Sequence, residues 1–232
     1  MAEPRTGPRR DAVATRKRLV RAALELFTTN GYHATTTPAI AARANVAEGT
    51  IYRHFPGKEA LLNEVFREAQ RWASRVVRED EGDKGMLTGD RLRRIARRLV
   101  ATAQSDPALV RMLLRTRDDV ELDDRSREAL REFRAGLAQV VASGKQTGAI
   151  RTGPAELWAA VWLALVAHAV DRVAAREWAP DHAHAAQVIE AAWDAIAWRA
   201  TPEPPTPSPA PGAHPGPART SPGGDAPAPG ST

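Results

Sequence analysis

The stretch TTPAIAARANVAEGTIYRHFPGK, residues 36 to 58, decides the fold of this chain. It contains two short segments of helical pattern on either side of a turn at Asn45-Val46-Ala47. Its apolar residues recur at spacings that let two helices pack across one small core. These residues are Ile40, Ala41, Ala44, Val46, Ile51 and Phe55.

The second helix of this stretch, expected over residues 47 to 54, carries the groups with the clearest chemistry. Its outward-facing side chains are Thr50, Tyr52, Arg53 and His54, with Lys58 just beyond. Hydroxyl, aromatic and cationic groups suit phosphates and base edges, and an arginine can read guanine O6 and N7. Gly49 costs about 1 kcal/mol of helix propensity relative to Ala. A glycine at this position is explained if any side chain there would hold the backbone away from a base pair. The pattern indicates a helix-turn-helix whose second helix enters the major groove of DNA.

The same region resembles the N-terminal domain of TetR-family transcriptional regulators, over the run from Thr15 to Phe66. The matching segments are TR at 15–16, AALELF at 22–27, GY at 31–32, TT at 35–36, IA at 40–41, ANV at 44–46, GTIYRHF at 49–55 and KEALL at 58–62. A single helix-turn-helix pattern is a weak signal, but this many matches in one ungapped register is a strong one. The resemblance covers about the first third of the chain, and the rest is similar to the family in being helical and of suitable length.

The resemblance implies roles for residues on both sides of the motif. Thr36 and Thr37 would touch the DNA backbone, and Lys58 would clamp a phosphate. The alternatives are that Thr36 acts only as a helix N-cap and that Lys58 is an ordinary surface lysine. Family members often have a Ser or Thr cap and a basic residue where this chain has Ala47 and Glu48. Glu48 could accept from cytosine N4 or merely favour the helix dipole, so the operator sequence stays open.

Charge is distributed unevenly along the chain. Residues 1 to 58 hold ten Lys/Arg and four Asp/Glu, whereas the remaining 174 residues hold 23 and 24. The excess positive charge therefore lies in the segment that would meet DNA, as counterion release requires. A solvated basic tail would give the same count of charges. The positive charge coincides with the helix-turn-helix, however, and this favours the nucleic-acid interpretation.

Composition excludes several kinds of site. The 232 residues contain no cysteine, which excludes disulfides, thiolate metal sites and cysteine nucleophiles. The N-terminus lacks the apolar segment of a signal peptide. The longest nearly apolar run, Leu157 to Val170, is too short to span a bilayer. We expect a soluble cytoplasmic protein with no membrane partner.

The helical pattern predicts an all-α fold of about nine helices in two domains. We expect a disordered basic arm over residues 1–11, a DNA-binding domain over 12–73, a helical ligand-binding and dimerisation domain over 74–200, and a disordered Pro/Gly/Ala-rich tail over 201–232. Helices are expected over 12–29, 47–54, 58–79, 90–105, 107–117, 154–177 and 180–199. Two more are expected, one that begins after the N-cap Thr36 and one that ends near residue 145. The tail holds eleven of the eighteen prolines and cannot form a core.

The last two helices carry more apolar surface than one chain needs. The helix over 154–177 is apolar around most of its circumference and must be covered on several sides. A homodimer that joins these two helices from each subunit into a four-helix bundle would bury the excess, and the family resemblance implies the same arrangement. The expected interface residues are Leu165, Ile189, Trp193 and Ile196.

A ligand pocket is expected among the helices between residues 90 and 177, lined by Met112, Trp162 and His168. The alternative for His168 is a buried or interfacial histidine. His182 and His184 lie two apart, on different sides of a helix, so they make a poor metal pair. The carboxylates of residues 118 to 124 could bind a cation, but a solvated connection before the next helix explains them as well.

Three functions are consistent with these patterns. The first is a homodimeric DNA-binding repressor, with a pseudo-palindromic operator, that an unknown small molecule relieves. The second is an enzyme that uses the carboxylates and histidines, but no nucleophile elbow, phosphate loop, metal spacing or cofactor motif supports it. The third is a helical ligand-binding or scaffold protein with a vestigial helix-turn-helix, against which the basic, contact-rich second helix argues. An activator, or a repressor that needs a corepressor, would look the same in sequence.

Overall fold

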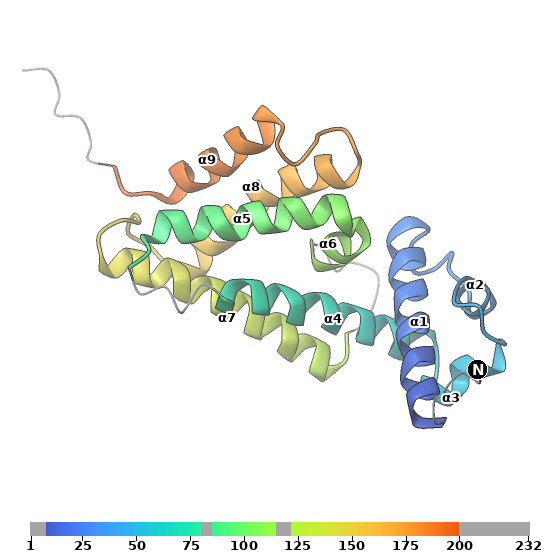
Figure 1. Cartoon of the computed structure of the whole chain (residues 1–232). Helices are drawn as coiled ribbons and strands as arrows, with labels where there is room; N and C mark the ends of the chain where they lie inside the picture. The colour runs from blue at the N-terminus through green and yellow to red at the C-terminus, as the bar shows by residue number, and fades with distance from the viewer. Residues whose placement is uncertain (1–7, 80–84, 115–121, 200–232) are drawn as a thin grey trace, which may run out of the picture. The chain divides into compact units, whose positions relative to one another are not determined.

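The computed structural model describes residues 8–79, 85–114 and 122–199, and its regular structure there is helical apart from one antiparallel bridge between Ile150 and Ala197. The helices are α1 (Pro8–Thr29), α2 (Thr37–Arg43), α3 (Gly49–His54), α4 (Lys58–Glu79), α5 (Thr88–Ser105), α6 (Pro107–Leu114), α7 (Asp124–Gln146), α8 (Ala155–Ala174) and α9 (Ala183–Ile196) (Figure 1). The expected all-α class is confirmed for these residues. The last residues of the segment expected to be a disordered arm, 8 to 11, are helical, because α1 begins at Pro8 rather than at Ala12. Residues 1–7 and the tail lie outside the described residues.

The short helix α2 begins as the sequence predicted. Thr36 is the N-cap, and its hydroxyl accepts the backbone N–H of Ala39 at 3.3 Å. Asn45 then adopts a φ of 53°, in the left-handed region that asparagine tolerates better than most residues. The turn takes up two residues more than expected, so α3 begins at Gly49 and not at Ala47.

Helix α4 connects the helix-turn-helix region, α1 to α3, to the rest of the chain. Its bounds, Lys58 and Glu79, are those predicted, since Pro56 and Gly57 separate it from α3. It continues without a break through the expected domain boundary at residue 73. In Figure 1 it leaves the group of α1, α2 and α3 and runs beside α7, against which it packs closely.

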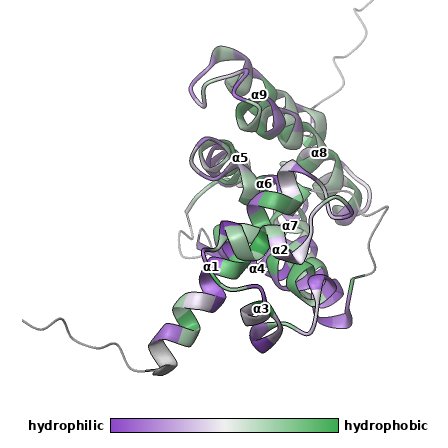
Figure 2. Ribbon diagram, turned by 90° about the vertical axis from the view of Figure 1, so that its right-hand side faces the viewer, coloured by the Kyte–Doolittle hydropathy of each residue, from purple (hydrophilic) through white to green (hydrophobic). Residues whose placement is uncertain are grey.

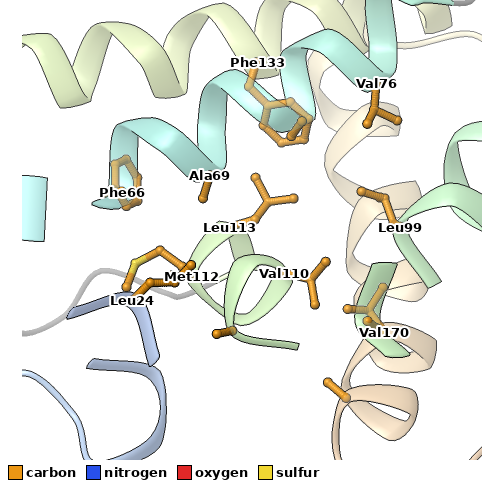
Figure 3. Packing of buried hydrophobic residues seen from close by; sticks show 14 of the residues in the cluster. Leu24, Phe66, Ala69, Val76, Leu99, Val110, Met112, Leu113, Phe133 and Val170 are labelled. Atoms are coloured by element: carbon orange, nitrogen blue, oxygen red, sulfur yellow. The ribbon is translucent and has the colours of Figure 1, made fainter. Parts of the chain in front are cut away.

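One hydrophobic core runs from α1 to α9. Met112 of α6 lies in it with Leu24 of α1 and Phe66 of α4, so α6 packs directly on α1 (Figure 3). Figure 2 shows hydrophilic residues on the outer side of α3, whereas α8 and α9 are mostly hydrophobic. The small helices are therefore held by the core and are polar where they face outward.

Several helix ends differ from the predicted ones. Helix α8 ends at Ala174, and Arg176 follows it with a φ of 61°. Helix α9 ends at Ile196 because the next residues pair with residues 149–151: Arg151 N–H donates to the Ile196 carbonyl at 3.0 Å and Trp198 N–H to the Ala149 carbonyl at 2.9 Å. Helix α5 starts two residues before the predicted Asp90. The predicted end of α6 near residue 117 lies outside the described residues.

Candidate nucleic-acid interface

Helix α3 is fixed from behind by a buried apolar face and open in front. Ile51 and Phe55 are buried with Ile40 of α2, which sets the orientation of the helix. On the opposite side Tyr52 is 55% exposed, and Arg53 is exposed next to it. A phenol and a guanidinium that project from a rigid helix can enter a groove without a large cost in ordering.

The other predicted contact residues lie around these two side chains. Thr37 at the start of α2 and Tyr52 in α3 meet through their hydroxyl oxygens, 3.4 Å apart. Gly49 is exposed, and a Cβ added there would meet no atom of the chain within 4 Å. Packing within the protein therefore does not demand glycine at this position. Thr50 and His54 are half-buried, and Thr36 is exposed at the cap of α2.

Lys58 is held by the protein itself. Its Nζ donates to the carbonyl oxygens of Tyr32 and Thr35 at 3.0 and 2.9 Å, and it lies 4.3 Å from the centre of the Tyr32 ring. The alternative of an ordinary surface lysine is therefore wrong. Two of its three N–H donors are occupied, which leaves one for a phosphate. Tyr32 itself packs against Phe27 and the core.

Two arginines of α1, Arg16 and Arg18, support the motif. Neither was assigned a role from the sequence, although Arg16 belongs to the matching segment at 15–16. Arg16 lies 4.7 Å from the centre of the Phe55 ring. Arg18 donates from Nη1 to the Asn45 carbonyl in the turn between α2 and α3, at 3.3 Å. The two contacts join residues that are 39 and 27 positions apart in the sequence, so no local spacing could have indicated them. Part of the positive charge assigned to DNA therefore serves the fold.

The three predicted pocket residues do not share one environment. Met112 and Trp162 are fully buried in the core, and among the described residues Nε1 of Trp162 has no hydrogen-bond partner. His168 is exposed instead, with its ring edge-on to Trp178 at 5.7 Å between centres. The expectation that His168 lines an internal pocket, or is buried within the chain, is corrected by this position.

Two of the four predicted dimer contacts need correction. Ile189 and Ile196 are buried within the chain's own core, and Trp193 is packed over Gly89 and Arg93 of α5. The reason is that α5 covers the side of α9 that carries these large residues. Leu165 of α8 remains partly exposed.

A different stripe on α8 faces outward. It is spaced by three and four residues, so it lies along one side of the helix, and its members are Leu157, Ala160, Ala164 and His168. Leu157 is 49% exposed. In the part of the chain that the structure describes, α8 is the one helix whose length and composition would allow it to cross a bilayer. Of its most apolar 18-residue segment, 39% is buried inside the protein. The core helix of a soluble protein meets the same criterion.

The carboxylates before α7 are structural where the structure describes them. Asp123 is the N-cap of α7 and accepts from Ser126 N–H at 2.7 Å. The same carboxylate accepts from the buried Arg67 of α4 at 2.7 Å. Burial alone would raise the pKa of Asp123, but hydrogen bonds from Ser126 and Arg67 outweigh burial and lower it. Asp118, Asp119 and Glu121 lie outside the described residues, and within those described no group of three acidic or histidine side chains is placed to hold a metal.

Comparison with known proteins places this geometry in a family. Residues 19–65 match the family model of bacterial regulatory proteins of the tetR family. The uncharacterised HTH-type transcriptional regulator YvkB of Bacillus subtilis is 39% identical over 69 residues, which are 30% of this chain and 36% of YvkB. The fatty acid metabolism regulator protein of the same species is 29% identical over 137 residues, 58% of this chain and 70% of that protein. The chain thus matches about a third of the length of YvkB and more of the second relative.

Solved structures extend the likeness over the C-terminal helices. A TetR family transcription regulator from Marinobacter aquaeolei VT8 superposes with a TM-score of 0.71 at 23% identity. The superposition covers 82% of this chain and 100% of that protein. FadR from Bacillus subtilis, solved in complex with stearoyl-CoA, gives a TM-score of 0.65 at 25% identity and covers 78% of this chain and 98% of its own. With its helix-turn-helix and these relatives, the N-terminal region of the chain, residues 19–65, belongs to the TetR family of transcriptional regulators, and the nine described helices have the fold of that family's solved structures.

Proposed function

We propose that this protein is a homodimeric, DNA-binding transcriptional repressor that a small molecule releases from its operator. The observation that carries the proposal is the outward face of α3, where exposed Tyr52 and Arg53 stand on a buried base of Ile51 and Phe55. That face lies in the basic part of the chain, where residues 1 to 58 hold ten Lys/Arg and four Asp/Glu. A rigid cationic helix with an apolar back suits the major groove.

The proposed DNA contacts divide into two kinds. Thr36, Thr37, Thr50, His54 and Lys58 would bind phosphates and fix the register of the protein on the duplex. A different set would approach the bases: Gly49 would let the backbone come close, and Tyr52 and Arg53 would reach the base edges. A bacterial regulator of this kind would act in the cytoplasm, where the chromosome lies.

A second copy of the chain would cover the exposed stripe of α8. Its small residues, Ala160 and Ala164, permit close approach of two helices, and a two-fold axis would repeat the contact on both subunits. Two α3 helices would then meet successive major-groove faces of a pseudo-palindromic operator. Dimerisation is thus a condition of specific binding.

The effector class to test first is a long-chain acyl-CoA. The similarity to the fatty acid metabolism regulator extends over 137 residues, more than the DNA-binding region contains, and FadR was solved with stearoyl-CoA. A ligand that prefers a state with differently placed α3 helices would lower operator affinity by its differential affinity for the two states. The relatives compared are transcription regulators, and we propose no catalytic role.

Selection of duplexes from a random pool by the purified full-length protein tests the main proposal. We expect an enriched pseudo-palindrome whose half-sites lie about one helical turn apart, bound by a dimer in light scattering. Stearoyl-CoA added to that complex should then release the DNA. A pool without enrichment at low salt would reject the function, whereas enrichment without release would reject only the ligand class.

A further inference from the structure

Asp106, the residue before α6, makes two interactions with one carboxylate. Its Oδ1 accepts the backbone N–H of Leu109 at 3.1 Å, which caps α6. Its Oδ2 accepts from Nη1 of Arg21 on α1 at 2.6 Å. The start of α6 is therefore tied to the DNA-binding region by the side chain that begins the helix.

Arg21 continues this connection toward α2. Its Nε donates to Oε1 of Glu25, one turn further along α1, at 2.8 Å. The second oxygen of Glu25, Oε2, accepts from Nε and Nη2 of Arg43 at 2.8 and 2.5 Å. Arg43 is the last residue of α2. We call these four alternating charges, Asp106, Arg21, Glu25 and Arg43, the α6–α2 relay.

The relay differs from a set of isolated surface ion pairs, which contribute little. The side chains of Glu25 and Asp106 are each only 26% exposed, whereas those of Arg21 and Arg43 are 47% and 60% exposed, so solvent screens the two carboxylates less than the two arginines. Burial by itself would lower the pKa of Arg21 and raise that of Glu25. Hydrogen bonds within the relay outweigh burial, so the pKa of Arg21 is raised and that of Glu25 is lowered. Both inner residues are thus held in their charged forms by partners on two sides.

The body of α1 can carry a displacement between the ends of the relay. Leu24 of α1 is buried in the same core as Met112 of α6 (Figure 3), and α1 also packs against α2. Helix α2 has only seven residues and begins at Thr37. A small change in its tilt would move Thr37 relative to Tyr52, whose hydroxyl lies 3.4 Å away.

We propose that Arg21 is a positioning residue for DNA binding, which keeps α2 in register with the start of α6 through the α6–α2 relay. The link to operator affinity rests on the proposed function, whereas the coupling between Asp106 and α2 is a property of the protein alone. Arg21 reaches its two carboxylates with different nitrogens. A lysine would keep the charge but offers one ammonium in place of that fork.

Hydrogen exchange of the full-length protein, followed by mass spectrometry, tests the coupling without DNA or ligand. Asp106→Asn keeps an oxygen that can cap α6 but removes the charge that binds Arg21. We expect amide exchange in α2 to become about two- to thirtyfold faster in this variant and in Arg21→Lys, the range of measured long-range couplings. Arg43→Gln cuts the relay at α2 itself. Adding Asp106→Asn to Arg43→Gln should cause no further increase, because both remove the same coupling.

Glu190→Gln is the matched control, since it breaks a comparable ion pair with Arg93, at 2.8 Å between α9 and α5. Exchange in α2 should not change in it. A second measurement, fluorescence anisotropy on the selected operator, should show weaker binding for Asp106→Asn and Arg21→Lys than for Glu190→Gln. Unchanged α2 exchange in both relay variants, or additive effects in the double variant, overturns the relay. Faster α2 exchange in a protein that binds no duplex would instead reject the proposed function and support the relay.

Discussion

The ammonium group of Lys58, at the first position of α4, donates to the carbonyl oxygen of Tyr32 at 3.0 Å, across 26 residues of sequence. A second hydrogen bond, to the Thr35 carbonyl at 2.9 Å, ties the same nitrogen to the loop between α1 and α2. A lysine in the first turn of a helix opposes the helix dipole. Here the carbonyl oxygens and the face of the Tyr32 ring, 4.3 Å away at its centre, offset that cost.

Lys58→Ala should therefore destabilise the protein as well as weaken DNA binding. We expect a loss of about 1.5–3 kcal/mol in unfolding free energy, since hydrogen bonds from a charged group are removed. Urea unfolding measures this. Lys58→Met is the control, because it keeps the apolar stem and removes only the ammonium, and it should lose nearly as much.

The DNA part of this prediction is a change in salt dependence. If the third N–H of Lys58 reaches a phosphate, the slope of log affinity against log salt should fall by about 1 in both variants, equally on all sequences. An unchanged slope in a variant of unchanged fold would limit Lys58 to its structural role. Stability equal to that of the wild type would contradict the structural role.

Arg53→Ala should relax base preference at one position of each half-site. Arg53 is exposed on α3, so the substitution leaves the core intact. A bidentate arginine–guanine contact gives about 1–3 kcal/mol of discrimination against the wrong base. Repeating the selection from random duplexes with the variant measures this directly. Recovery of the wild-type operator with the same preference at every position would exclude base reading by Arg53.

Local chemistry explains which features the sequence could predict. The cap at Thr36 and the start of α4 after Pro56-Gly57 depend on a few adjacent residues, and both were confirmed. The pattern also identified Ile51 and Phe55 as the buried side of α3. The bonds from Lys58 to Tyr32 and Thr35 could not be predicted, because they join residues that only the folded α1–α2 loop brings together.

The predicted dimer residues show a second limit to what the sequence alone can predict. Periodicity indicated that Ile189, Trp193 and Ile196 share a face of α9, but not whether a copy of the chain or another helix of the same chain covers it. Helix α5 covers it, as the contacts of Trp193 with Gly89 and Arg93 show. The outward stripe of α8 is less conspicuous in sequence because two of its members are alanines.

Ala164→Arg and Ile189→Ala should separate these two faces experimentally. Ala164 lies in the exposed stripe of α8, so a charge there would face its own copy across a two-fold axis, at a cost of several kcal/mol to the dimer. Ile189→Ala removes a buried side chain and should cost about 2–5 kcal/mol of unfolding free energy while the dimer persists. Light scattering and thermal unfolding of both variants check this. A dimeric Ala164→Arg protein would place the interface elsewhere.

The carboxylate of Glu64 should make stability depend on pH. It lies 2.9 Å from Nη2 of Arg67 on α4 and 3.0 Å from Nη2 of Arg16 on α1, with Arg71 at 3.9 Å. Burial alone would raise the pKa of Glu64, but the hydrogen bonds from Arg67 and Arg16 outweigh burial and hold it below the ordinary value of 4.5. A carboxyl whose pKa is lower in the folded state contributes stability above its unfolded pKa. That contribution is lost as the pH falls through the folded value.

Glu64→Gln should therefore be less stable than the wild type at pH 7, by about 1–2 kcal/mol for the lost charged hydrogen bonds, and the difference should shrink below about pH 4.5. Asp123, whose pKa is also lowered, shares Arg67 and titrates in the same acidic range. Comparing the two proteins at each pH cancels that second titration to first order, because both contain Asp123. Urea unfolding between pH 7 and pH 3 measures the difference. A difference in unfolding free energy that stays constant over this pH range would mean that Glu64 acts through packing and that its charge does not stabilise the junction of α1 and α4.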